Sequence, residues 1–347
     1  MNIINNQLTL DNALDFINKQ PIAQYAKIDN FYKIAGDASF RSYYRININD
    51  KSYVIMFAPP KLERTSHFIE VDKFLIKNKM PAPKIIGSDT INGLLLLEDF
   101  GDNNINNHLK NITNNKNDNL YQEQEQYLYC KAIDILLEIA NLDHYHFVSS
   151  YNNNELLREA MLLIEWYLPF KKIKISDEEI AKYKKTLFNL FDLLDKSKQI
   201  LVLRDYHSEN LMVINQKDIG ILDFQDALIG SPAYDLVSLL EDARRDILPQ
   251  TVDYCFKYYL NNIKSSFDYL INDYHILSLQ RNLKILGIFC RLSIRDEKDQ
   301  YLKYLPRVES FVTKRINDNY CQFTNKELSF MLPISDLLKK ILNRHEH

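Results

Sequence analysis

The scarcity of glycine constrains this chain most, because only 7 of its 347 residues are Gly. Loops that bring backbone close to a nucleotide phosphate are usually built from clustered glycines, as in G-x-G-x-x-G and G-x-x-x-x-G-K-[ST]. Neither pattern occurs, and G-x-S-x-G is missing as well. The sequence therefore excludes a standard Rossmann fingerprint, a Walker A loop and the nucleophile elbow of an α/β-hydrolase.

Length and charge narrow the class further. A chain of 347 residues is long enough for two domains or one large bilobal unit. Its net charge of −3 gives no broad basic footprint for nucleic acid. No apolar run reaches the length of a membrane span, the N-terminus lacks a signal-peptide pattern, and the four cysteines are far apart. We expect a monomeric cytoplasmic protein with reduced thiols that binds neither nucleic acid nor membrane.

The first third of the chain alternates between strand-like and helix-like patterns. Residues 53–57 form a short, partly β-branched apolar run before two prolines, and residues 94–97 are four consecutive leucines. Both runs are typical of strands. Apolar residues at helical spacing between His67 and Lys79 predict a helix between them. These patterns predict a small sheet-based lobe over residues 1–100.

The remainder, residues 101–347, is predicted to be a larger lobe that is mainly helical. It opens with residues 102–118, which are rich in asparagine and predict a flexible surface loop. A strand at 200–203 and a β-hairpin of 211–214 and 219–222 interrupt the helices. The expected helices lie at 122–140, 155–168, 177–196, 233–245, 250–265, 274–294, 299–317 and 334–343.

Three polar side chains surround the predicted hairpin. Asn210 just precedes its first strand and Asp223 just follows its second, so the hairpin brings both to the same end. Asp205 lies five residues before Asn210, and the short loop returns it to that end. Phosphoryl transfer needs such a set, in which one carboxylate orients a hydroxyl proton and a second carboxylate and an amide oxygen hold Mg²⁺.

The same residues stand in kinase order. L-R-D-Y-H-S-E-N at 203–210 resembles the catalytic loop H-R-D-L-x-x-x-N, and D-F-Q at 223–225 resembles D-F-G. Asp and Asn are also the usual turn residues, which gives each of them a purely structural interpretation. The order, the spacing and the position around a strand–loop–hairpin together favour the functional interpretation.

Longer stretches resemble the aminoglycoside-phosphotransferase-like kinases, and within them the bacterial N-acetylmuramate/N-acetylglucosamine anomeric kinases of cell-wall recycling. The resemblance implies an α+β, protein-kinase-like bilobal fold, with a small N-terminal sheet lobe carrying one main helix and a larger helical C-terminal lobe. It also implies phosphorylation of the anomeric hydroxyl of an amino sugar, with ATP as the donor and Mg²⁺ as the metal. The matching stretches are 36–45, 54–60, 94–102, 165–168, 203–213, 220–243 and 280–308.

Roles follow from the matched motifs. The resemblance makes Asp205 the catalytic base, or the residue that orients the hydroxyl. It makes Asn210 and Asp223 the Mg²⁺ ligands. The nucleotide-binding lobe would be residues 1–100, and the lobe with the catalytic loop and substrate site would be residues 101–347.

Nucleotide contacts are expected at two further places. Glu98, Asp99 and Phe100 lie where the hinge should offer backbone groups to adenine. The segment 35–44 takes the place of the phosphate-covering loop, and with one glycine it would have to rely on Ser39 and nearby backbone N–H groups.

The lysine that kinases use on the nucleotide phosphates is missing. The best-matching strand reads V-I-M at 54–56, with no Lys in the slot. Arg41 or Arg45 could supply the charge, because the planar guanidinium donates two parallel bonds to phosphate. A surface salt bridge is the alternative for either arginine.

Sugar recognition is expected from a helix and from the residues after the metal-binding Asp. Glu159 and Trp166 sit on a predicted helix, where a carboxylate can accept sugar hydroxyls and an aromatic face can stack on a pyranose. A single Trp is, however, more often a core residue. Gln225 and Asp226 directly follow Asp223, so proximity favours a polar role near the substrate.

Other polar residues have structural interpretations. Asp235 opens an apolar helix, which indicates a cap or a brace on the catalytic loop. Arg291, Arg295 and Lys298 form a basic stripe, which is typical of a solvated face, with a phosphate contact as the alternative.

Two other functions stay open. One is a kinase for a different alcohol, such as choline, homoserine or an aminoglycoside. The other is a nucleotide-binding pseudokinase, motivated by the absent lysine and opposed by the intact Asp205, Asn210 and Asp223.

Overall fold

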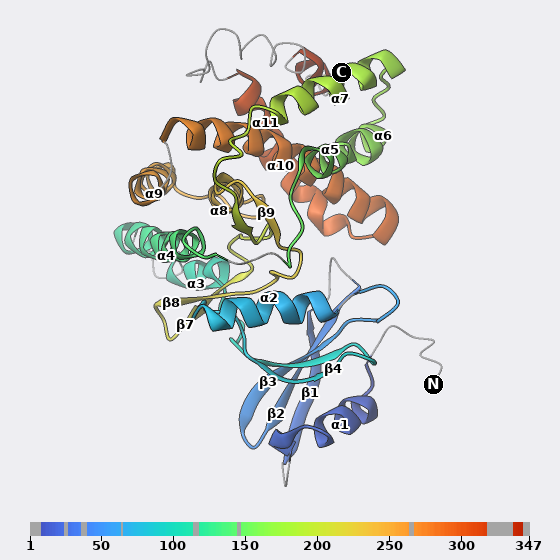
Figure 1. Ribbon diagram of the computed structural model, residues 1–347, viewed down its shortest axis with the longest axis vertical. Coiled ribbons are helices and arrows are strands. Elements are labelled where there is room, and N and C mark those ends of the chain that lie inside the picture. The colour runs from blue at the N-terminus through green and yellow to red at the C-terminus, as the bar shows by residue number, and fades with distance from the viewer. Residues whose placement is uncertain are drawn as a thin grey trace. The chain divides into compact units, whose positions relative to one another are not determined.

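The computed structural model forms two compact units (Figure 1). The first contains the described residues of Met1–Asn117 together with Glu209–Ala227, and the second contains those of Asp118–Ser208 and Leu228–His347. The assignment of nucleotide binding to residues 1–100 and of substrate binding to 101–347 stays a prediction. The structure describes residues 8–23, 27–35, 40–63, 65–113, 118–143, 147–263, 267–317 and 336–342.

A five-stranded antiparallel sheet is the centre of the first unit. Its spatial order is β1-β2-β3-β5-β4, so the predicted strands over 53–57 and 94–97 are neighbours. The sheet strands are β1 Ile28–Ala35, β2 Ser42–Ile48, β3 Lys51–Phe57, β4 Ile85–Asp89 and β5 Leu94–Glu98.

The two faces of this sheet differ in character. One face carries Tyr44, Ile55 and Leu96, which are paired across three strands and pack with α1 (Leu10–Asn18) in one hydrophobic cluster. Side chains alternate along a strand, so Arg45 points to the opposite face. Arg45 therefore lies on the face away from the hydrophobic cluster, beside Val54 and Leu97.

Helix α2 (Thr65–Lys77) is the main helix of the unit and runs along the sheet in Figure 1. It confirms the helix predicted between His67 and Lys79. Its apolar stripe includes Phe68, whose ring lies 5.1 Å from the ring of Phe224. The segment after the hairpin is thereby packed against α2.

The predicted hairpin is confirmed as β7 (Leu211–Ile214) and β8 (Asp218–Ile221). It packs within the first unit, because the Val213 N–H donates to the Asn103 carbonyl at 2.7 Å and the Ile221 N–H donates to the Pro81 carbonyl at 2.9 Å. Gly220 permits a close approach, since a Cβ there would lie 2.7 Å from the ring of Phe100.

The prediction of a loop over 102–118 is wrong at residues 105–113, because these residues form helix α3 (Ile105–Thr113). Ile105 and Leu109 are buried one turn apart, and the Asn104 side chain accepts the Asn107 N–H at 2.9 Å. Two apolar anchors and an N-cap were enough to outweigh the asparagine-rich composition. Residues 114–117 lie outside the described residues.

The second unit is mainly helical, as predicted. A two-stranded sheet of β6 (Ile200–Val202) and β9 (Leu228–Gly230) joins the helices, and β6 confirms the strand predicted at 200–203. Residues 336–342 form one further helical segment. The named helices are α4 Asp118–Ile139, α5 Asn153–Ala160, α6 Leu168–Phe170, α7 Asp177–Phe191, α8 Ala233–Leu240, α9 Pro249–Asn262, α10 Phe267–Asp296 and α11 Leu305–Asn317.

The helix predicted over 155–168 is interrupted. After α5, residues Leu163–Tyr167 form a π-helical turn, η2, before α6 begins. Short 3-10 segments also occur, η1 at Pro21–Ala23 and η3 at Asp299–Tyr304.

None of the helices described combines the length and apolar character that a bilayer crossing requires. Cys130, Cys255 and Cys290 are free thiols, while Cys321 lies outside the described residues.

Candidate active site

Asn210 and Asp223 meet at the open end of the hairpin, as the sequence predicted. The Asn210 carbonyl accepts the Leu222 N–H at 2.9 Å, which continues the strand pairing. The Asn210 amide then donates to Asp223 Oδ2 at 3.3 Å. Asp223 has a φ of 59°, in the left-handed region, which marks the turn out of β8. An amide and a carboxylate are thus held side by side within the first unit.

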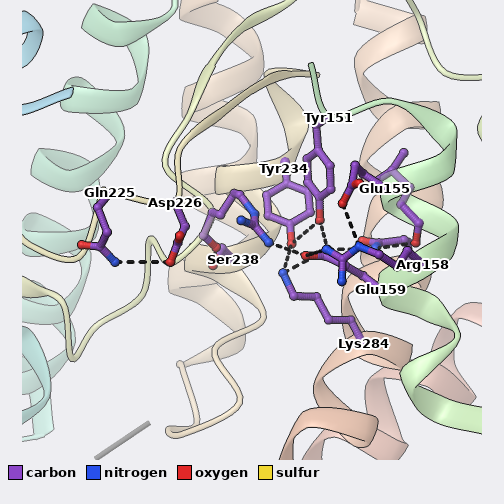
Figure 2. A network of polar contacts seen from close by, with 12 residues as sticks. Tyr151, Glu155, Arg158, Glu159, Gln225, Asp226, Tyr234, Ser238 and Lys284 are labelled. Atoms are coloured by element: carbon purple, nitrogen blue, oxygen red, sulfur yellow. Dashed lines mark hydrogen bonds and ion pairs between the residues drawn. The ribbon is translucent and has the colours of Figure 1, made fainter. Parts of the chain in front are cut away.

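Gln225 and Asp226 extend this group. Gln225 Nε2 donates to Asp223 Oδ1 at 2.7 Å. It also approaches Asp226 Oδ2 at 3.4 Å (Figure 2). The Gln225 side chain is buried, whereas that of Asp226 is exposed. Gln225 therefore orients Asp223, and Asp226 remains accessible.

Arg41 contributes the positive charge nearest to this group. One nitrogen of its guanidinium lies 3.6 Å from Asp223 Oδ1, and the other lies 3.0 Å from Glu63 and 3.7 Å from Asp226. The side chain is buried, so its position is fixed by packing as well as by charge. Of the two arginines that could replace the missing lysine, Arg41 is the one beside Asp223.

Arg45 is engaged elsewhere in the same unit. It donates to both oxygens of Asp99, at 2.6 and 3.1 Å, and to Asp102 at 2.6 Å. Ser52 and the Gly101 N–H also donate to Asp99, at 2.5 and 2.8 Å. Arg45 thus forms the salt bridge that the sequence allowed as an alternative, although the pair is buried.

The hinge-like segment uses its side chains for structure. The Glu98 N–H donates to the Lys84 carbonyl at 2.9 Å, and Phe100 fills the space left by Gly220. Any nucleotide contact there would come from backbone atoms. Ser39, which was expected to help cover the phosphates, lies outside the described residues.

The segment that carries Asp205 belongs to the second unit and is braced from α8. Asp235 accepts the backbone N–H groups of Leu203 and Arg204, at 2.6 and 2.8 Å, and the Ser238 hydroxyl donates to the Arg204 carbonyl at 3.2 Å. Arg204 has a φ of 72°, which is unfavourable for a residue with a side chain. The predicted brace is confirmed, and it holds a strained residue directly before Asp205.

Burial raises the pKa of Asp235 to about 7, although the two backbone donors oppose this shift. Further along the loop, the Tyr206 hydroxyl donates to the Ala132 carbonyl at 2.7 Å and the Ser208 hydroxyl donates to Asp242 at 2.5 Å. The loop is therefore fastened at both sides of Asp205.

Glu159 is the centre of a polar network in the second unit (Figure 2). Its carboxylate accepts from the Tyr151 hydroxyl and from the Arg204 guanidinium, and Lys284 Nζ lies 3.1 Å away. Tyr151 and Tyr234 are hydrogen-bonded to each other at 3.1 Å. The network thus connects α5 and α10 with the loop residue Arg204.

Glu159 is only 3% exposed. Burial would raise the pKa of its carboxyl, but Lys284 and Arg204 outweigh burial and lower the pKa to about 2. A buried, ionised carboxylate with its oxygens already occupied is suited to fixing Arg204 and poorly placed to accept sugar hydroxyls. Trp166, in contrast, lies in the π-helical turn and is partly exposed.

Sequence reasoning missed the tyrosines and the lysine of this network, because they lie outside the kinase-like motifs and on separate parts of the chain. Tyr151 and Tyr234 are 83 residues apart. The available signal was Lys284, a lysine within an otherwise apolar helical stretch, since lysine is almost never buried without a partner.

The sequence model of the phosphotransferase enzyme family matches residues 31–270. This chain belongs to that family. Two curated members of comparable length are similar to it, both named N-acetylmuramate/N-acetylglucosamine kinase. The protein from Pseudomonas aeruginosa is 31% identical over 81% of this chain and 83% of its own, and that from Pseudomonas putida is 31% identical over 81% and 82%. The chain is therefore a small-molecule phosphotransferase.

Solved structures agree on the fold. The structure of a streptomycin–ATP–APH(2″)-IIa ternary complex matches 88% of this chain and all of that one, with a TM-score of 0.59 and 16% identity. At that identity the likeness shows the fold, which is the protein-kinase-like fold expected from the sequence.

Proposed function

We propose that this phosphotransferase transfers the γ-phosphoryl group of ATP to the anomeric hydroxyl of N-acetylmuramate and N-acetylglucosamine. The names of the curated relatives support N-acetylmuramate and N-acetylglucosamine as the acceptors, and the family supports phosphoryl transfer as the reaction. We further propose that it works as a monomer in the cytoplasm, in the recycling of cell-wall sugars. The observation that carries the chemistry is the pairing of Asn210 with Asp223 at the end of the hairpin.

The donor set at this pair fits a magnesium ion. Mg²⁺ prefers a few hard oxygen ligands and leaves its other positions to phosphate and water. Asp223 has a carboxylate that is 41% exposed, and the Asn210 amide lies beside it, donating through its nitrogen to Asp223 Oδ2. Asn210 and Asp223 would hold the ion, which supplies positive charge to the nucleotide phosphates when bound.

Asp205 is assigned the role of orienting the anomeric hydroxyl and accepting its proton. Its position depends on Arg204, because a residue with a strained backbone keeps its geometry only when its surroundings enforce it. Asp235 supplies that constraint through the backbone, and Glu159 supplies it through the guanidinium. Glu159 is therefore a positioning residue in this proposal.

Binding roles are assigned to the remaining candidates by their surroundings. Arg41 places a fixed guanidinium beside Asp223, where phosphate oxygens would lie. Backbone groups of Glu98, Asp99 and Phe100 would meet adenine. On the acceptor side, Asp226 would accept sugar hydroxyls, and Trp166 would offer an apolar face. Gln225 acts through Asp223, to which it donates.

Phosphorus NMR tests the proposal directly. The protein is incubated with ATP, Mg²⁺ and one acceptor at a time, and the position of the new phosphomonoester is read from its coupling to the sugar protons. We expect a sugar 1-phosphate and ADP with either amino sugar, and unchanged ATP without an acceptor.

The same assay with choline, homoserine and an aminoglycoside identifies a different acceptor. Turnover on one of these and none on the amino sugars would replace the proposed substrate. Nucleotide binding with no turnover on any acceptor would identify a pseudokinase.

A further inference from the structure

Helix α10 approaches the π-helical turn η2 unusually closely. Gly287 of α10 faces the start of η2, and a Cβ at this position would lie 2.3 Å from the Leu162 carbonyl carbon and oxygen. Any side chain there would push the two elements apart. Single π-helical turns inside helices are frequent at functional sites. The described residues on the two sides of this contact are therefore worth examining for a binding site.

Arg291 lies one helical turn after Gly287 and so shares its side of α10. Its Nε atom is buried, and no hydrogen-bond partner for this atom occurs among the residues that the structure describes. The carboxylates of Glu165 and Asp296 influence it electrostatically, but neither forms an ion pair with it in the described chain. Among the described residues, Arg291 is thus a half-buried cation without an ion-pair partner.

The neighbours of Arg291 add positive charge. Arg158 of α5 and Arg295 of α10 both repel it, and together with burial they lower the pKa of Arg291. These two arginines have partners of their own. Arg158 donates to Glu155 at 2.8 Å, and Arg295 donates to the carboxylate of Asp296 at 2.7 and 2.8 Å.

Among the described residues, Arg291 is therefore the arginine of this group that has no ion pair of its own, although the exposed carboxylate of Glu165 acts on it electrostatically. Removing a cation from water without a partner is costly, and a bound anion removes that cost. The guanidinium is also the group best shaped for a carboxylate, because it can donate two parallel hydrogen bonds to it.

Arg158 lies close to the loop that carries Asp205, within the second unit. Arg158 is 3.8 Å from Glu159, and the same carboxylate oxygen accepts from Arg204 (Figure 2). A single carboxylate thus separates Arg158 from the residue before Asp205. Trp166 directly follows Glu165 in η2, and its side chain is partly exposed.

We propose that Arg291, with the charge of Arg158 nearby, forms a subsite for the carboxylate of an acidic amino sugar. This inference rests on the proposed function and specifies it: of the two sugars, only N-acetylmuramate carries a carboxylate. The neutral sugar leaves Arg291 to water, so it is still accepted but binds more weakly. The basic stripe interpreted from sequence as a solvated face thus includes one residue with a binding role.

Steady-state kinetics with three acceptors test the subsite. The acceptors are N-acetylmuramate, its methyl ester and N-acetylglucosamine, and the ester differs from the acid by its missing charge. For the natural chain, we expect the ester to have a KM close to that of the neutral sugar. For R291Q, we expect the KM of N-acetylmuramate to rise about 10- to 100-fold, the usual worth of a charge-assisted hydrogen bond. The KM of N-acetylglucosamine should change less than about threefold.

Two further variants serve as controls. R295Q removes an exposed arginine of the same helix that is paired with Asp296, and it should leave all three KM values unchanged. R291K keeps the positive charge and loses the planar guanidinium. Compared with R291Q, it should restore part of the affinity for N-acetylmuramate and for no other acceptor. Equal losses on acid, ester and neutral sugar in R291Q would assign Arg291 a purely structural role and overturn the subsite.

The two proposals fail in different ways. If the natural chain phosphorylates neither sugar, the proposed function is wrong. If it phosphorylates both but treats the acid and its methyl ester alike, the function stands and the carboxylate subsite is wrong. The ester comparison needs no variant, so it decides the matter even if R291Q does not fold.

Discussion

The two units of this protein hold their central carboxylates in opposite ways. Asp223 in the first unit has a side chain that is 41% exposed, and Asn210, Gln225 and Arg41 approach it. Glu159 in the second unit is buried and accepts from Arg204, Lys284 and Tyr151. A carboxylate on an exposed side chain is accessible to a cation from solution. One whose oxygens are taken by buried cations fixes the geometry of its neighbours instead.

This contrast predicts that variants of accessible carboxylates and of buried, ion-paired carboxylates lose different properties, and Asp205 and Glu159 allow the test within the second unit. The largest expected effect is on turnover. D205N removes the proposed proton acceptor, which is partly exposed, and should lower kcat about 10²- to 10⁴-fold, the usual worth of a positioned base. Its urea unfolding curve should stay close to that of the natural chain. Near-normal turnover in D205N would refute the role of Asp205.

For E159Q, the expected loss is in stability. It leaves the charges of Arg204 and Lys284 buried without their carboxylate, so we expect a loss of about 3–5 kcal/mol in the free energy of unfolding. E155Q is the matched control, because Glu155 lies on the same helix in an exposed pair with Arg158, and its loss should stay below about 1 kcal/mol. Urea unfolding of both variants measures the difference.

The E159Q effect should also depend on pH. The lowered pKa of Glu159 means that its stabilising contribution is complete above the ordinary value of 4.5 and is lost as the pH falls toward about 2. The stability gap between E159Q and the natural chain should therefore narrow on acidification in this range. A gap that is constant with pH would show that the charge of Glu159 is not what stabilises the network.

Arg41 and Arg45 sharpen the comparison within the first unit. R45Q leaves the buried carboxylate of Asp99 without its cation and should cost about 3 kcal/mol of stability. R41Q removes the guanidinium beside Asp223, so it should raise the KM for ATP about tenfold by loss of a charge-assisted contact. Kinetics and urea unfolding of both variants test this division, and a higher KM for ATP in R45Q than in R41Q would reverse it.

The smallest expected effect concerns Asp72 of α2. It is 2% exposed, and its Oδ1 has no hydrogen-bond partner among the described residues, so burial raises its pKa from 3.8 to about 7. Between these values the folded chain binds a proton that the unfolded chain has released, so stability falls as the pH rises. D72N avoids this loss and should be more stable by about 2 kcal/mol at pH 8, and by less at pH 5. Urea unfolding at both pH values checks the sign.

Sequence reasoning succeeded where the signal was local. The order of residues around the hairpin predicted that Asn210 and Asp223 would lie together, because a two-stranded turn leaves little freedom in where its ends lie. It failed at α3, where asparagine-rich composition hid two apolar residues one turn apart. Composition averages over a segment, whereas a helix needs only one buried face.

The network around Glu159 could not have been found in the same way. Gln280 and Glu159 are 121 residues apart, and their approach depends on how α10 packs on α5. The sequence showed a carboxylate on a helix and favoured a sugar-binding role. It did not show that two buried cations, Arg204 and Lys284, interact with that carboxylate.

Gly220 has a consequence that extends beyond the hairpin in which it lies. The flat backbone at this position lets the ring of Phe100 rest on the strand between Asn210 and Asp223. The segment proposed to meet adenine thus packs directly on the hairpin whose ends carry the residues proposed to meet the metal. Even one added methyl group at position 220 would displace the Phe100 ring and disturb that packing.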